Sequence, residues 1–259
     1  SGQVVGHIIG FLTTGLRGPS WEVDLLAVLP EWTRRGLATR LIRAVSAEGA
    51  QHARRGRAVV ATDNNASARA FRRAGFRPAP DTCQLLITRP QEQGPCLPGE
   101  RSLTIHEAGG TAELAAWLAG EQMPTEATAQ RPGQVDQSYG NLRLLVAGQD
   151  GQAAGYAELI LVQTLLYRGL WIESFVASQQ TAGRALVCAV MNQAFAAGLD
   201  EVGAMVPSAD GSLQETLLAA GFRSLGEFRW LQARLPLPGI ATASLREVDP
   251  GVLRRSDGV

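Results

Sequence analysis

Residues 21–42 read WEVDLLAVLPEWTRRGLATRLI, and this stretch decides the fold because it joins a buried strand to an amphipathic helix. The apolar run that ends at Val28 has the length of a strand, and Pro30 stops it. Apolar residues then recur at helical spacing, which predicts a helix that begins near Thr33 or Arg34.

The loop at the start of this predicted helix has the properties of an anion site. The first turn of a helix has backbone N–H groups without intrahelical partners, and it carries the positive end of the helix dipole. Gly36 and Ala38 are small and leave room for a bulky anion to approach that backbone. The pattern therefore predicts a cradle for a phosphate or pyrophosphate group.

Strand, loop and helix of this kind resemble the acetyl-CoA-binding motif of the GNAT superfamily of N-acetyltransferases. The family pattern is Gln or Arg, two variable residues, Gly, one variable residue, and Gly or Ala, and it falls on residues 33–38. Thr33 departs from it at the first position. The resemblance implies an enzyme that transfers an acetyl group from acetyl-CoA to a primary amine by direct attack. It implies no covalent enzyme intermediate and no metal.

The resemblance also implies which residues hold the acetyl-CoA. The end of the central strand is expected to part from its neighbour and to present a backbone amide to the thioester carbonyl. Asn64 and Phe71 fall where a second family motif has Asn and Tyr; Phe71 lacks the hydroxyl with which that Tyr often protonates the departing thiolate. Asn64 has an equally good explanation as a helix N-cap. The predicted cofactor-binding residues are Leu26, Ala27, Val28, Arg34, Arg35, Gly36, Leu37, Ala38, Thr39, Asn64 and Phe71.

Two carboxylates on the central strand are the candidate catalytic groups. A general base must take a proton from the acceptor amine, and several GNAT members place a glutamate where Glu22 stands. Asp24 follows two residues later and faces the same side of a strand. Two carboxylates this close are expected to raise one another's pKa, and the alternative is a polar strand end that faces solvent.

The order of these motifs occurs twice in the chain. Gly151-Gln152 and Gly155 match Gly2-Gln3 and Gly6, the 180–185 stretch matches 33–38, and 220–223 matches 74–77. Three matches in one order at a nearly constant offset indicate two tandem copies of one α/β unit. We therefore expect an α/β (α+β layered) fold with two GNAT-like units, each a mixed, mostly antiparallel sheet flanked by helices.

The predicted boundaries follow from these copies. Residues 1–89 form an N-terminal unit without its first strand and helices, and 90–100 form a linker rich in Pro and Gly. Residues 101–236 form a complete C-terminal unit. The tail 237–259 resembles the opening of that unit, so it either adds a strand to the N-terminal sheet or is an ordinary extended tail.

In the second copy the loop pattern is better at Gln180, Gly183 and Ala185, but Asp210 and Leu217 replace the Asn and Tyr of the second motif. Glu173, Tyr156 and Tyr167 are the groups near its cleft that could serve as base or acid. The replacements keep a second function class open, a non-catalytic acyl-CoA-binding or regulatory tandem GNAT protein.

Composition limits the partners and the compartment. All 24 basic residues are arginine, and with 24 acidic residues the net charge is zero, which argues against a nucleic-acid-binding protein. Residues 1–100 carry 13 arginines against 8 acidic residues, so the half with the cradle is basic. No apolar run has the length of a membrane span, and three scattered cysteines favour a cytoplasmic protein. We expect a monomer or homodimer that acts on a small-molecule amine or a protein N-terminus.

Overall fold

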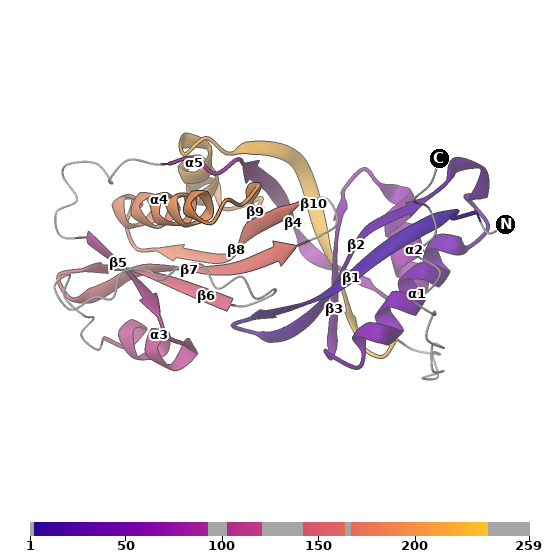
Figure 1. The fold of residues 1–259 in the computed structure, drawn as a ribbon, viewed down its shortest axis with the longest axis horizontal. Helices are drawn as coiled ribbons and strands as arrows, with labels where there is room; N and C mark the ends of the chain where they lie inside the picture. Colours follow the sequence, from indigo (N-terminus) through magenta and orange to yellow (C-terminus); the bar gives the residue numbers. More distant parts are fainter. Residues whose placement is uncertain (1–2, 93–102, 121–141, 164–166, 238–259) are drawn as a thin grey trace, which may run out of the picture.

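One mixed sheet of ten strands runs through the whole molecule, in the order β1-β2-β3-β10-β4-β9-β8-β7-β6-β5 (Figure 1). The computed structural model describes residues 3–92, 103–120, 142–163 and 167–237. The first half contains β1 (Gly6–Gly15), β2 (Gly18–Val28), the 3-10 helix η1 (Pro30–Trp32), α1 (Leu37–Gly49), β3 (Arg55–Ala61), α2 (Asn65–Ala74) and β4 (Arg77–Thr88). The second half contains β5 (Leu103–Ala108), α3 (Thr111–Leu118), β6 (Leu142–Gln149), β7 (Gln152–Gln163), β8 (Arg168–Ala177), α4 (Gln180–Ala196), β9 (Glu201–Pro207), α5 (Gly211–Ala219) and β10 (Arg223–Arg234).

The two halves repeat one order of elements. The series β1, β2, α1, β3, α2, β4 has the same order as β7, β8, α4, β9, α5, β10. In each half the first two strands are antiparallel, and the second pairs in parallel with the strand after the helix. The mixed α/β sheet flanked by helices confirms the predicted fold class, with the difference that both units contribute to one continuous sheet.

The last strands of the two halves are exchanged at the centre of this sheet. Strand β10 lies between β3 and β4 and is antiparallel to both. Strand β4 in turn pairs with β9 of the second half. Each half therefore completes its sheet with the last strand of the other, and an approximate two-fold relation passes between β4 and β10.

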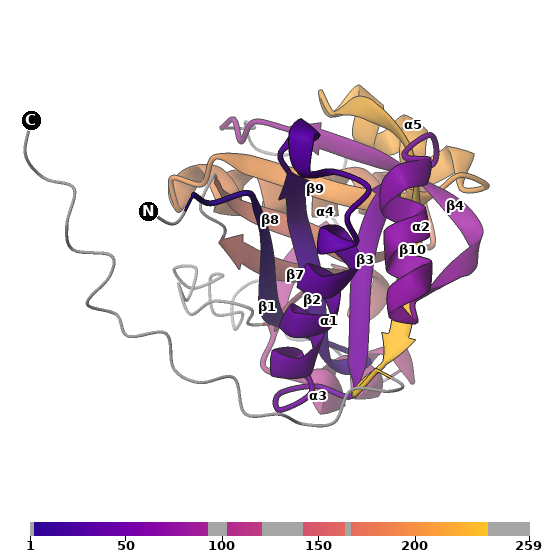
Figure 2. The same cartoon turned by 90° about the vertical axis from the view of Figure 1, so that its right-hand side faces the viewer.

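Helices α1 and α2 lie together on one face of the first half, whereas in the second half α4 and α5 lie on one face of the sheet and α3 on the other (Figures 1 and 2). In the first half, α1 and α2 pack on the sheet over a core that contains Ile42, Phe71 and Phe76. Leu231, Leu235 and Leu237, from β10 and the residues after it, belong to this same core. In the second half, α4 lies over the core formed by β6 to β9.

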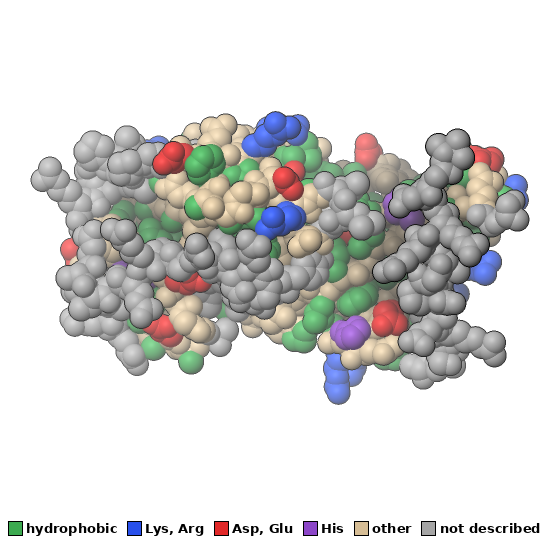
Figure 3. All heavy atoms as spheres, viewed as in Figure 1, with side chains coloured by type: hydrophobic (Ala, Val, Ile, Leu, Met, Phe, Trp, Pro, Cys, Tyr) green, Lys and Arg blue, Asp and Glu red, His purple; other side chains and the backbone are tan. Residues whose placement is uncertain are grey.

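Two predicted segments fall outside the described residues. These are the tail 238–259, with its proposed extra strand, and most of the linker 90–100. None of the described helices has both the length and the apolar content that a membrane span requires. On the face drawn in Figure 3, the acidic and basic side chains of the described residues are interspersed.

Candidate active site

The site begins where β2 and β3 part. These strands are paired only at Trp21–Gly56 and Glu22–Arg57 among the described residues. Beyond Arg57, β3 keeps only its pairing with β10, which runs from Arg55 to Ala61. The later residues of β2 pair with β1 alone, so the predicted parting of the central strand from its neighbour is present in the structure.

A β-bulge in β2 adjoins the point where the strands part. Ile9 pairs with Asp24 and His7 with Ala27, so β2 has one residue more than β1 in this interval. Leu25, in the bulge, has a left-handed φ of 48°. Its N–H donates to Asp24 Oδ1 at 2.7 Å. The bulge therefore fixes the carboxylate of Asp24 beside the opening between the two strands.

The predicted cradle is an exposed turn at the start of α1. Helix α1 begins at Leu37, later than the predicted start near Thr33 or Arg34, because Arg34 and Gly36 have left-handed φ values of 62° and 76°. A Cβ built on Gly36 meets no atom within 4 Å, so the turn is open to solvent. The first helical bond runs from Arg40 N–H to the Gly36 carbonyl, which leaves the N–H groups of residues 37–39 ahead of the helical ladder.

The two arginines of the turn differ in their contacts. The Arg35 guanidinium lies over the Trp32 ring, 4.6 Å from its centroid. Both Arg34 and Arg35 are exposed, while Leu37, Ala38 and Thr39 are half-buried. On the strand side, Ala27 is exposed and Leu26 and Val28 are half-buried. The turn, the strand end and the helix start thus offer backbone amides and positive charge on one side of the N-terminal half.

Asn64 and Phe71 have structural roles in α2. The Asn64 side chain accepts a hydrogen bond from Ser67 N–H at 3.1 Å, so it caps the helix. Phe71 is buried with 3% of its surface exposed, and its ring meets Phe76 edge-on at 5.2 Å. Phe71 is therefore a core residue of the first half, and its contact with the cofactor stays a prediction.

The second copy does not form a second cradle of this kind. The residues that match the loop pattern lie inside α4, which begins at Gln180, and Gly183 and Ala185 are buried. Only two residues separate β8 from α4, whereas eight residues, including η1, separate β2 from α1. Phe175 and Ala177 lie close to Gly183 and occupy the corresponding space. The second copy therefore fits the pattern better in sequence, but the structure does not form the open turn there.

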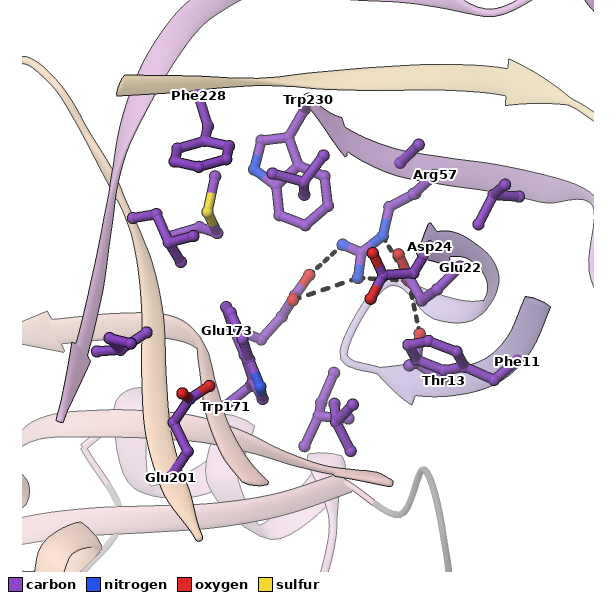
Figure 4. A pocket seen from close by; sticks show the side chains of 18 of the residues that line it. Phe11, Thr13, Glu22, Asp24, Arg57, Trp171, Glu173, Glu201, Phe228 and Trp230 are labelled. Carbon is purple, nitrogen blue, oxygen red and sulfur yellow. Dashed lines mark hydrogen bonds and ion pairs between the residues drawn. The ribbon is translucent and has the colours of Figure 1, made fainter. Parts of the chain in front are cut away.

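A cavity of about 290 Å³ lies where the two halves meet. Its lining includes Val23 and Asp24 on β2 and Ala58 and Val59 on β3, so it reaches the point where these strands part. The other walls come from β1, β4, β7, β8, β9 and β10, and from Tyr167 just before β8 (Figure 4). The cavity therefore combines side chains of both copies.

Arg57 connects the two halves inside this cavity (Figure 4). Its Nε donates to Glu22 Oε1 at 2.8 Å, and its Nη2 forms an ion pair with the same oxygen at 2.7 Å. Thr13 Oγ1 also donates to this oxygen, at 2.8 Å. On its other side it pairs with Glu173 of β8, with Nη2 at 3.2 Å from Oε2. The guanidinium also lies over Trp230 of β10, 4.7 Å from the ring centroid.

This network changes the interpretation of Glu22. Burial lowers the pKa of Arg57, but the charges and hydrogen bonds of Glu22 and Glu173 outweigh burial and raise it above its usual value. Arg57 is therefore permanently charged. Glu22 is buried, and one of its oxygens accepts two hydrogen bonds and forms an ion pair with Arg57 Nη2. Glu22 therefore positions Arg57 between the two halves, and its role as a general base stays a prediction.

Asp24 is the carboxylate that remains available. Within the described part of the chain it forms no ion pair. Burial raises its pKa, and the hydrogen bond from Leu25 N–H lowers it in part. The proposed mutual effect of Glu22 and Asp24 is therefore replaced by burial as the cause. A raised pKa brings this carboxylate closer to neutral pH, and a general base works best when its pKa is near the operating pH.

Sequence reasoning missed Arg57 and Trp230, and it placed Tyr167 in the wrong cleft. Tyr167 belongs to the second half but lines the shared cavity, while Tyr156 lines a different hollow. Burial and the charges of Asp24 and Glu201 raise the pKa of Tyr167, which keeps its hydroxyl protonated. Arg57 follows Arg54 and Arg55 and comes directly before the apolar end of β3, and a charge beside that apolar run was the available signal.

Comparisons with known protein families and solved structures bear on the N-terminal sequence pattern and on the fold. Residues 1–76 match the model of the acetyltransferase (GNAT) family. A GCN5-related N-acetyltransferase from Kribbella flavida is 16% identical, with a TM-score of 0.54 over 92% of this chain and 89% of its own. One from Sphaerobacter thermophilus is 17% identical (TM-score 0.49, 87% and 76% of the two chains). A tandem GNAT protein from the clavulanic acid biosynthesis pathway is also 17% identical (TM-score 0.49, 90% and 80%). No curated protein matches.

The resemblance to the GNAT superfamily is thereby confirmed. The fold of the chain is that of a GCN5-related N-acetyltransferase, and its first 76 residues carry the sequence pattern of the GNAT acetyltransferase family. That family uses acetyl-CoA as its donor, and the open turn at Gly36, the helix start and the exposed arginines fit a pyrophosphate group.

Proposed function

We propose that this protein transfers the acetyl group of acetyl-CoA to a primary amine, with the donor held by the N-terminal half. The observation that carries the proposal is that β2 and β3 part beside the start of α1 and that residues on both sides of this parting line the shared cavity. A donor whose pyrophosphate lies on the α1 turn can reach the parting of β2 and β3 from one side of the sheet. The acceptor amine can reach the same point from the other side.

In this proposal Asp24 accepts a proton from the amine. A bond forms between the amine nitrogen and the acetyl carbon, the bond between that carbon and sulfur breaks, and the sulfur leaves as the thiolate of CoA and takes up a proton. Backbone amides at residues 26–28 stabilise the negative charge that develops on the carbonyl oxygen. The acceptor is a small-molecule amine or a protein N-terminus. The free thiols of Cys83 and Cys188 suit a reducing cytoplasm.

The loop assignment is tested with Gly36→Glu. The glutamate places a negative charge at the helix start, so we expect acetyl-CoA affinity to fall by roughly 100-fold or more in isothermal titration calorimetry. Gly198→Glu is the matched control because Gly198 also has a positive φ, 61°, and open space around its Cβ. Both variants lose about 1–2 kcal/mol of stability from the backbone strain, but only Gly36→Glu loses binding. Equal affinity in the two variants would reject the assignment.

The alternative is an acyl-CoA-binding protein without catalysis, and it is favoured by the core positions of Phe71 and Leu217. No tyrosine stands at either place to protonate the thiolate. Release of free CoA thiol separates the two functions. If acetyl-CoA binds but a broad panel of amines releases no thiol above the rate in buffer, the binding function holds and the transferase function is rejected.

A further inference from the structure

The charge balance of the shared cavity is acidic. Its described lining holds four carboxylates, Glu22, Asp24, Glu173 and Glu201, and one guanidinium, that of Arg57. Such a lining attracts a cation and repels an anion.

The guanidinium of Arg57 is already engaged by protein groups and is not available to pair with an anionic ligand. Arg57 is held by Glu22 on one side and Glu173 on the other, and its face lies on Trp230. A substrate carboxylate or phosphate in the cavity would have to displace one of these partners. An anion left unpaired in a buried site costs several kcal/mol, so the cavity discriminates against amino acids and phosphorylated amines.

The other two carboxylates of the lining, Asp24 and Glu201, do not pair with Arg57. Burial raises the pKa of Asp24, and burial together with Asp200 raises that of Glu201, against the opposing charge of Arg223. A bound ammonium would offset the cost of keeping a buried carboxylate ionised. Asp24 is the one of the two that lies beside the parted strands.

The remaining walls are largely apolar, with the hydroxyl groups of Thr13 and Tyr167 as exceptions. They come from six strands, and their large side chains are Phe11, Ile160, Trp171, Met205, Phe228 and Trp230 (Figure 4). Aromatic and aliphatic walls favour an apolar body and offer few partners to a polyhydroxylated one. A cavity of about 290 Å³ lies at the small end of ligand sites.

We propose that the acceptor is a small hydrophobic amine, aryl or alkyl, whose ammonium is its only charge and binds to Asp24. This inference rests on the proposed function and narrows its substrate class. The same carboxylate that holds the ammonium then accepts its proton, so binding and activation of the acceptor share one group. The body of the amine packs between Phe11, Trp171 and Phe228.

The test compares amines that differ in one property. Phenethylamine has the predicted chemistry, phenylalanine adds a carboxylate to the same body, and glucosamine replaces the apolar body with hydroxyl groups. We expect kcat/KM for phenethylamine to exceed that for each of the others by roughly 100-fold, since the carboxylate or the several hydroxyl groups would lose water without gaining partners. Equal or faster acetylation of phenylalanine or glucosamine would overturn the inference while leaving the transferase function intact.

Binding is measured separately so that the two failures can be told apart. Phenethylamine is titrated into the protein by calorimetry with and without acetyl-CoA. We expect Asp24→Asn to weaken its binding at least tenfold, and Glu48→Gln, a change of an exposed carboxylate on α1, to leave it unchanged. If acetyl-CoA does not bind, the proposed function fails. The phenethylamine titration still shows whether the cavity binds a hydrophobic amine. Absence of phenethylamine binding, or binding that Asp24→Asn does not weaken, overturns the inference.

Discussion

Asp24 is a half-buried carboxylate whose cost in stability follows from its place in the cavity. Burial raises its pKa above the ordinary value of 3.8, so the folded protein binds this proton more tightly than the unfolded chain does. Stability is therefore lost as the pH rises from that ordinary value through the raised pKa. We expect Asp24→Asn to melt at a higher temperature than the natural protein at pH 7, and the gain to shrink as the pH falls toward 4.

The side-chain amide that Asp24→Asn introduces has a carbonyl oxygen that would still accept the hydrogen bond from Leu25 N–H, so the bulge is retained. Melting curves of both proteins at several pH values, with Glu48→Gln as the exposed control, check this expectation. A variant that is less stable than the natural protein at neutral pH would show that the carboxylate is compensated by a partner.

Arg57 presents the opposite case, because its removal leaves two carboxylates without their cation. Glu22 and Glu173 are largely buried, with 11% and 23% of their side-chain surfaces exposed. Breaking a buried ion pair in this way costs about 3–5 kcal/mol, and we expect that loss for Arg57→Met in urea unfolding. Arg69→Met, at an exposed position of α2, is the control. When Glu22→Gln and Glu173→Gln are added to Arg57→Met, we expect the free energy of unfolding to recover in part. A loss below about 1 kcal/mol for Arg57→Met alone would contradict a buried ion-pair network.

For single residues, the sequence indicated that Glu22 and Asp24 lie on the same side of β2, because side chains alternate along a strand and this needs only neighbouring residues. It did not indicate which of them is neutralised. That outcome depends on Arg57 and on Glu173, which lies 116 positions from Arg57, and no local pattern links them.

The element that separates the two copies is the helix after the central strand. Helix α1 follows an open turn with left-handed residues, whereas α4 starts within two residues of β8 and buries its matching glycine. We therefore expect one molecule of acetyl-CoA per chain in calorimetry. Arg35→Glu is expected to weaken its binding roughly tenfold through the loss of a charged contact, and Arg184→Glu, an exposed change in the first turns of α4, to leave it unchanged.

Binding of two molecules, or equal effects of the two substitutions, would show that the second copy also holds the donor. The sequence placed the donor on the first copy but left open which copy is active, because Gln180 matches the family pattern and Thr33 does not. If Glu173 is aligned with Asp24, the connection in the second copy is two residues shorter. The helix start shows what this means, since α4 begins before a turn can form.

At the scale of the whole molecule, the exchange of β4 and β10 joins the copies. The sequence predicted two units from the repeat, and the repeated order of elements is present. The exchange could not be predicted because residues 77–88 and 223–234 are equivalent segments of the repeat, so either strand has the pattern to complete either sheet. The shared cavity follows from this exchange, since β10 brings Phe228 and Trp230 to the side chains of the N-terminal half.

The exchange predicts that the two halves unfold together. Leu231 of β10 is 3% exposed and belongs to the core beneath α1 and α2, although it lies near the C-terminal end of the described chain. We expect Leu231→Ala to cost about 2–5 kcal/mol and to shift a single calorimetric transition of the entire protein, because neither half keeps a complete sheet without the other's last strand. Leu225→Ala, on the same strand but 44% exposed, should shift it little. Two separate transitions, of which only one moves with Leu231→Ala, would mean that the halves are thermodynamically independent despite the shared strands.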